Sequence, residues 1–120
     1  DEFGTPDIVL DDGSHQMDDV NATFNWLYSR LYSGGIYLVE DLHTAYWNEF
    51  GGGFRRPGTF IERCKDLIDE FNADHTRGAL PPTEFSVATQ SMHIYDSVVV
   101  FERGRAVDKR SIITGNAQHY

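Results

Sequence analysis

Two short apolar runs, each followed at once by acidic residues, constrain this chain of 120 residues more than any other feature. Residues 8–12 read Ile-Val-Leu-Asp-Asp, and residues 36–41 read Ile-Tyr-Leu-Val-Glu-Asp. Runs this short and this apolar are typical of buried strands in a parallel sheet. We therefore predict two buried strands, each ending in carboxylates.

The segment between the two runs predicts a helix. Apolar residues recur at gaps of three and four from Met17 to Leu31, which places them in one stripe. Asp18 and Asp19 fall in the first turn, where the helix dipole favours anions, and the glycines at 34–35 end the helix. A strand, a helix and a strand in this order form a right-handed parallel unit. The acidic strand ends should therefore meet at one edge of the sheet, where ligands of open parallel sheets bind.

The rest of the chain predicts a loop, a second helix and a hairpin. Residues 42–58 are rich in glycine and aromatic residues, and loops of this length are typical of functional lids. Residues 59–71 predict a helix that begins with a capping box of Thr59 and Glu62. Its expected buried face consists of Ile61, Cys64, Leu67, Ile68 and Phe71. Residues 85–94 and 98–102 predict two strands, which so short a link must make antiparallel.

These elements predict an α/β fold with the order β-α-β-α-β-β and an antiparallel final hairpin. The order matches the C-terminal half of a doubly wound, Rossmann-like sheet. We expect one domain over residues 1–103 and a polar tail or peripheral extension over residues 104–120. The chain begins with Asp rather than Met, and we expect an upstream part to precede it.

Composition narrows the possible partners. The net charge is −9 and the acidic residues are spread along the chain, which argues against nucleic acid or an anionic membrane as partner. No apolar run approaches the roughly 20 residues of a membrane span. A single cysteine allows no internal disulfide and fits a reducing compartment, so we expect a cytoplasmic protein.

The residues at the strand ends predict a metal-assisted transfer site. Asp12, Glu40 and Asp41 supply hard oxygen ligands for one small cation, and His15 supplies a base beside them. Each has a simpler role to weigh against this one. Asp12 could cap the following helix, and His15 could be an ordinary surface histidine. His43 could orient a metal-binding carboxylate or merely cover the sheet.

Three segments resemble class I S-adenosylmethionine-dependent methyltransferases: residues 7–15, residues 34–44 and Tyr46-Trp47. They are most similar to the metal-dependent sugar O-methyltransferases of macrolide antibiotic biosynthesis, of the mycinamicin type. The resemblance implies S-adenosylmethionine and Mg²⁺ as cofactors, with Asp12, Glu40 and Asp41 as metal ligands and His15 as general base. It also implies a small hydroxylated acceptor, a sugar or another polyhydroxylated natural product.

The resemblance has one large gap. The glycine-rich cofactor loop of the family has no counterpart in this sequence, so the cofactor-binding residues are unknown. We therefore expect the chain alone to bind S-adenosylmethionine poorly and to be inactive. Its leading strand should be an open sheet edge, which favours self-association or pairing with an upstream half-domain.

Several alternatives stay open. Tyr46 and Trp47 could line an acceptor pocket or pin the loop to the core. Asp12, His15 and His43 could form a two-histidine, one-carboxylate set for the iron of a non-haem hydroxylase, but this leaves Glu40 and Asp41 without a role. The chain could also be a truncated, non-catalytic binding or assembly module.

Overall fold

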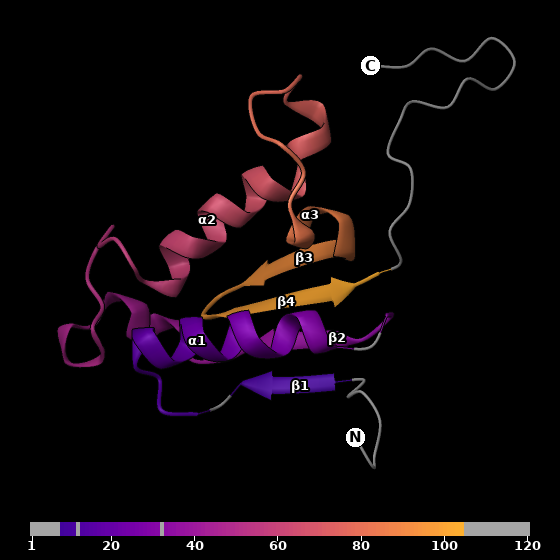
Figure 1. Ribbon diagram of the computed structural model, residues 1–120. Helices are drawn as coiled ribbons and strands as arrows, with labels where there is room; N and C mark the ends of the chain where they lie inside the picture. The colour runs from indigo at the N-terminus through magenta and orange to yellow at the C-terminus, as the bar shows by residue number, and fades with distance from the viewer. Residues whose placement is uncertain (1–7, 12, 32, 105–120) are drawn as a thin grey trace, which may run out of the picture.

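The computed structural model describes residues 8–11, 13–31 and 33–104, which form a four-stranded mixed sheet with helices packed against it (Figure 1). The strands are β1 (Ile8–Asp11), β2 (Ile36–Val39), β3 (Thr89–Tyr95) and β4 (Val98–Arg103). The α-helices are α1 (Met17–Leu27), α2 (Phe60–Phe71) and α3 (Glu84–Ala88). The 3₁₀ helices are η1 (Tyr28–Arg30), η2 (Leu42–Tyr46), η3 (Asn48–Phe50) and η4 (Ala73–His75).

The strand order β1-β2-β4-β3 confirms the predicted topology. β1 and β2 are parallel, with Ile8 opposite Ile36 and Asp11 opposite Val39. β4 is antiparallel both to β2 and to β3, so the last two strands form the expected hairpin. The parallel pair is connected through α1, and this crossover brings the carboxyl ends of β1 and β2 to the same edge of the sheet.

A cluster of aromatic rings on one face of the sheet joins it to all three α-helices. The ring of Phe24 in α1 lies 4.9–6.3 Å, centroid to centroid, from the rings of Tyr37, Phe60, Phe85 and Phe101. These four residues come from β2, α2, α3 and β4. One ring in α1 therefore holds the sheet and the other helices together.

The opposite face of the sheet is open in the described part of the chain. Ile8 and Leu10 are 68% and 54% exposed, whereas Val9 between them packs against the core. Side chains alternate between the two faces of a strand, so Ile8 and Leu10 point away from the helices. The prediction that β1 is a buried strand is therefore wrong for these two residues, although its parallel pairing is confirmed.

The prediction of a strand from residue 85 is also wrong, because residues 84–88 form α3. The Thr83 hydroxyl accepts a hydrogen bond from the Ser86 amide at 3.2 Å, and the Ser86 hydroxyl accepts one from the Thr83 amide at 2.8 Å. This reciprocal capping box provides hydrogen-bond partners for amides in the first turn of the helix. In a strand, such amides would bond a neighbouring strand instead. β3 begins only at Thr89.

The helix α2 begins at the predicted residue, but only half of the predicted capping box forms and the buried face is narrower than expected. The Thr59 hydroxyl caps the helix by accepting a hydrogen bond from the Glu62 amide at 3.3 Å. The Thr59 amide donates to the Arg56 carbonyl instead of the Glu62 carboxylate. Cys64 and Leu67 are buried as expected, but Ile68 is 41% exposed, so its assignment to the buried face is wrong. The helix predicted up to Leu31 ends as an α-helix at Leu27, and η1 completes it with a tighter turn.

The loop over residues 42–58 is folded on itself rather than irregular. It contains η2 and η3, and the amides of Gly52 and Gly53 donate to the carbonyls of Trp47 and Ala45 at 2.9 Å. A Cβ atom on Gly52 would lie 2.3 Å from the Ala45 carbonyl oxygen, so glycine is required there. The loop therefore has a defined structure, which begins at the carboxyl end of β2.

Two further features concern the limits of the fold. In the part of the chain that the structure describes, no helix combines the length and the apolar character needed to cross a membrane. The predicted tail falls almost wholly on residues 105–120, which lie outside the described residues.

We expect Phe101→Ala to lower the free energy of unfolding by about 3–5 kcal/mol, because it leaves a cavity in the aromatic cluster. Phe101 is fully buried, whereas Phe54 is 77% exposed and is the matched control. Phe54→Ala should change the same free energy by less than about 0.5 kcal/mol. Urea denaturation followed by tryptophan fluorescence measures both. Equal effects of the two substitutions would contradict the assigned core.

Candidate active site

The carboxyl ends of β1 and β2 are held together by their backbones. The Glu40 amide donates a hydrogen bond to the Asp11 carbonyl at 3.3 Å, which extends the parallel pairing one residue beyond β2. The loops that follow the two strands therefore start side by side. Asp12, the first predicted metal ligand, lies outside the described residues.

Asp41 turns the chain sharply at the end of β2. Its backbone is left-handed, with φ at 56°, which is uncommon for a residue other than glycine. The Thr44 amide and hydroxyl both donate to the Asp41 carbonyl, at 3.1 and 3.0 Å. This bend starts η2 and leaves the Asp41 side chain partly exposed at the sheet edge.

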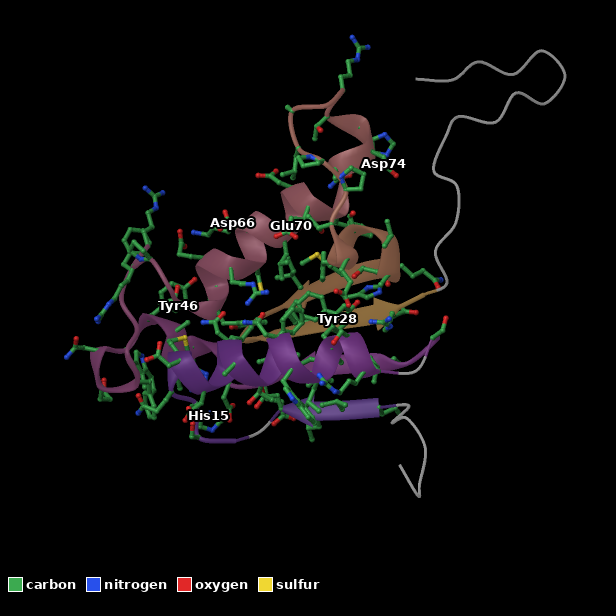
Figure 2. The ribbon with its side chains drawn as sticks, in the orientation of Figure 1. His15, Tyr28, Tyr46, Asp66, Glu70 and Asp74 are labelled. Atoms are coloured by element: carbon green, nitrogen blue, oxygen red, sulfur yellow. The ribbon has the colours of Figure 1, made fainter. Side chains whose placement is uncertain are left out.

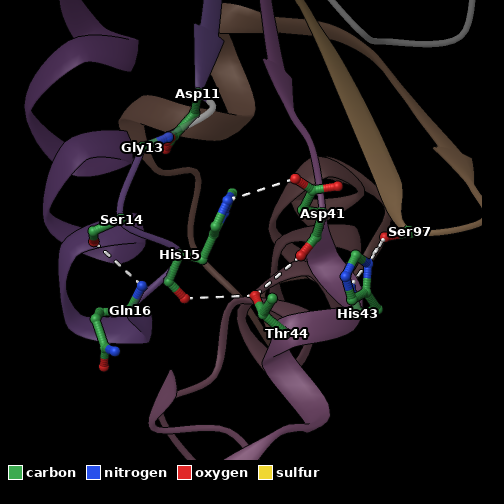
Figure 3. A network of polar contacts seen from close by, with 9 residues as sticks. All are labelled: Asp11, Gly13, Ser14, His15, Gln16, Asp41, His43, Thr44 and Ser97. Carbon is green, nitrogen blue, oxygen red and sulfur yellow. Dashed lines mark hydrogen bonds and ion pairs between the residues drawn. The ribbon is translucent and has the colours of Figure 1, made fainter. Parts of the chain in front are cut away.

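His15 reaches Asp41 from the loop after β1, as Figure 3 shows. Its Nε2 atom lies 3.5 Å from Oδ2 of Asp41, and the two side chains are 27% and 45% exposed. The Thr44 hydroxyl, which bonds Asp41, also lies within 3.5 Å of the His15 carbonyl oxygen. The His15 ring packs edge-on against Phe50 at 6.3 Å. The structure thus brings together the predicted base and one predicted metal ligand.

The donor set at this edge has the chemistry that a hard cation requires. Glu40, half-buried, and Asp41 are adjacent in sequence, and both carry carboxylates, which Mg²⁺ prefers to nitrogen or sulfur ligands. Among the described residues, which leave out Asp12, no group of three or more His, Cys, Asp or Glu side chains is placed to hold a metal ion. The three-carboxylate set therefore stays a prediction.

Asp11, the last residue of β1, bonds the neighbouring turn and the core. One carboxylate oxygen accepts from the Gly13 amide at 3.4 Å, and the other accepts from the Tyr37 hydroxyl at 3.5 Å. Burial raises the pKa of the Tyr37 phenol, and the neighbouring Asp11 charge raises that pKa further. The phenol is therefore protonated at neutral pH and donates this hydrogen bond.

His43 faces the tip of the β3–β4 hairpin. Its Nδ1 atom lies 2.7 Å from the Ser97 hydroxyl, and its backbone amide donates to the same oxygen at 3.1 Å. The sequence marked Ser97 only as part of a tight turn, so its contact with the site was missed. Trp47 packs edge-on against the His43 ring at 4.9 Å, which favours the interpretation that Trp47 pins the loop to the core.

A mostly apolar groove of about 220 Å³ lies beside this cluster, between α2, η2 and the hairpin tip. Tyr46 lines the groove and is 48% exposed, whereas Trp47 is not among its lining residues. Ile68 also lines the groove, which explains why this residue of α2 is exposed rather than buried. Cys64 forms part of the groove wall. Burial raises the pKa of its thiol to about 12, so the thiol is uncharged at neutral pH and packs as an apolar core group.

A somewhat larger hollow, of about 260 Å³, lies between the three α-helices and Arg103. Arg103 bonds Gly35, which precedes β2, so this hollow opens toward the other end of the sheet. We nevertheless place the candidate site at the carboxyl ends of β1 and β2, because Asp41 and His15 come together there.

Comparisons with known proteins agree with these features. No protein-family profile matches the chain. It is 36% identical over 111 residues to the mycinamicin VI 2''-O-methyltransferase of Micromonospora griseorubida, covering 86% of this chain and 27% of that protein. It is 35% identical over 111 residues to the demethylmacrocin O-methyltransferase of Streptomyces fradiae, covering 85% and 27% of the two chains.

The fold matches a solved structure of the same kind. The MycE methyltransferase of the mycinamycin biosynthetic pathway, in complex with Mg and SAH, has a TM-score of 0.80 and 33% identity to this chain. The match covers 99% of this chain and 32% of that one. Its complex with Mg, SAH and mycinamycin VI gives a TM-score of 0.78 and 34% identity, over 99% and 31% of the two chains. The resemblance noted in the sequence is thereby confirmed: this chain is a homologue of the macrolide sugar O-methyltransferases and spans 27% of the two enzymes named above and 32% of the MycE chain.

Proposed function

We propose that this chain supplies the metal-binding and proton-accepting part of an S-adenosylmethionine-dependent O-methyltransferase. The acceptor is a hydroxyl of a sugar or another polyhydroxylated natural product, and the protein acts in the cytoplasm. The observation that carries the proposal is the contact between His15 and Asp41 at the ends of two parallel strands. Because the chain spans less than a third of the length of these relatives in sequence and 32% of the MycE chain, we assign it these parts of the reaction rather than the whole.

We assign Asp12, Glu40 and Asp41 as the residues that hold Mg²⁺. The MycE structure contains Mg, and carboxylates at adjacent strand ends suit a small hard cation. When bound, the ion orients the acceptor hydroxyl and makes its proton more acidic. The Asp41 side chain is 45% exposed, so an ion can reach its carboxylate from solvent.

We assign His15 as the general base. Its imidazole accepts the proton of the acceptor hydroxyl while the oxygen attacks the methyl carbon of the sulfonium, so that the O–C bond forms as the C–S bond breaks. Asp41, 3.5 Å away, stabilises the positive charge that the imidazole gains. Thr44 and Phe50 hold the His15 backbone and ring in place.

We assign the apolar groove to the less polar part of the acceptor, with Tyr46 at its wall. Trp47 instead holds His43 and Phe50. The iron-hydroxylase alternative is weaker, since it leaves Glu40 and Asp41 without a role and the relatives reported above are named O-methyltransferases.

Isothermal titration calorimetry of the chain with Mg²⁺ tests the metal assignment. We expect measurable binding by the wild type and none by Asp41→Asn in the millimolar range, because a charged ligand is lost. Asparagine is chosen since it tolerates the left-handed backbone at this position. Asp74→Asn is the control, because Asp74 lies far from His15 in the molecule (Figure 2). Wild-type protein that is folded but binds no Mg²⁺ would refute the assignment.

A chimera tests the role of His15. Residues 8–104 replace the matching segment of the mycinamicin VI 2''-O-methyltransferase, and transfer of a labelled methyl group is measured. We expect the chimera to be active and His15→Ala to lower kcat by about 10²–10⁴-fold, the usual contribution of a general base. Mg²⁺ affinity should stay within a few-fold, since His15 is not assigned as a ligand. Full activity of the His15→Ala chimera would contradict its role.

Sedimentation velocity tests the expected self-association. Ile8 and Leu10 leave β1 with an exposed apolar face, and β2 is its partner strand in the described part of the chain. We therefore expect oligomers whose population rises with concentration. The double variant Ile8→Lys and Leu10→Lys should shift the distribution toward the monomer. A wild-type protein that sediments only as a monomer would disprove this proposal.

A further inference from the structure

We propose that Ser97, at the tip of the β3–β4 hairpin, is a positioning residue that holds the Asp41 carboxylate where it binds the cation. The inference rests on the proposed function, in which Asp41 is a metal ligand. It adds a residue from a distant part of the chain, to which the sequence analysis assigned no functional role.

Ser97 contacts both residues that follow Asp41, and Figure 3 shows its contact with the second of them, His43. Its carbonyl oxygen accepts a hydrogen bond from the Leu42 amide at 2.9 Å. Its hydroxyl accepts one from the His43 amide at 3.1 Å and lies 2.7 Å from His43 Nδ1. One residue of the hairpin thus fixes the start of η2, although 54 positions separate it from His43.

These contacts matter because of the bend at Asp41. A left-handed backbone is unfavourable for most residues, and such a conformation persists only when its surroundings hold it. Thr44 holds the Asp41 carbonyl, and Ser97 holds the next two residues. The direction of the Asp41 side chain therefore depends on where the hairpin tip places Leu42 and His43.

The contact between His43 and Ser97 is partly covered by the loop over residues 42–58. The half-buried His43 ring packs against Trp47 at 4.9 Å, which limits the access of water to its contact with Ser97. Hydrogen bonds are stronger where water is excluded, and groups that orient metal ligands commonly change metal affinity by about 10–100-fold.

The substitution Ser97→Gly separates positioning from simple turn formation. Ser97 itself has φ at 63°, a conformation that glycine adopts freely. The variant keeps the carbonyl that bonds Leu42 and removes only the hydroxyl that bonds His43. A residue that served only the turn could be replaced by glycine without loss of Mg²⁺ affinity.

Calorimetry with Mg²⁺, thermal unfolding and amide hydrogen exchange test the proposal on the chain itself. For Ser97→Gly we expect roughly ten-fold weaker Mg²⁺ binding, faster exchange of the His43 amide and an unfolding midpoint close to that of the wild type. Wild-type Mg²⁺ affinity in this variant would overturn the inference and leave the proposed function intact. Absence of Mg²⁺ binding in the wild type would overturn the proposed function as well.

A second pair of variants keeps the test decisive if Ser97→Gly is unstable. His43→Asn places an amide near the position of Nδ1 and can still bond Ser97, whereas His43→Leu cannot. We expect His43→Asn to retain Mg²⁺ affinity within a few-fold and His43→Leu to lose about ten-fold. Equal affinities in the two variants would contradict positioning through Ser97.

Discussion

The parallel pairing of β1 with β2 is the interaction on which the site depends. It places Asp11 opposite Val39 and lets the Glu40 amide bond the Asp11 carbonyl, so the loops after both strands begin at one point. A slip of one residue would move every side chain of a strand to the other face of the sheet. His15 and Asp41 therefore meet because of this register rather than through their own weak attraction.

The aromatic cluster around Phe24 gives this edge a rigid support. Functional side chains are placed most accurately when strands and helices carry them, and here His15 and Asp41 follow closely on the ends of β1 and β2. Tyr37 connects the two regions, because its ring lies in the cluster and its hydroxyl bonds Asp11. Packing in the core and geometry at the strand ends are thus coupled through one residue.

Much of this arrangement could be predicted from the sequence, since it follows from local patterns and one topological rule. The apolar runs predicted the strands, the gaps of three and four predicted α1, and the crossover rule predicted that the acidic strand ends would meet at one edge of the sheet. Ser97 could not be predicted, because its contact joins a hairpin tip to a loop 54 positions away. The exposure of Ile8 and Leu10 was missed for another reason: an apolar pattern shows what prefers burial, but not what covers it.

The left-handed backbones at His15, Asp41 and Ser97 have a consequence for attempts to make the protein more heat-resistant. Each such conformation costs on the order of 1–3 kcal/mol in a residue other than glycine, so the site stores strain that the rest of the fold must offset. Random selection for a higher melting temperature should reach His15 and Asp41 early, by way of glycine or asparagine, whereas at Ser97 the relief of strain is offset by loss of the hydroxyl that bonds the His43 amide. Each degree gained at His15 or Asp41 would come at the expense of the side chains around which the site is built.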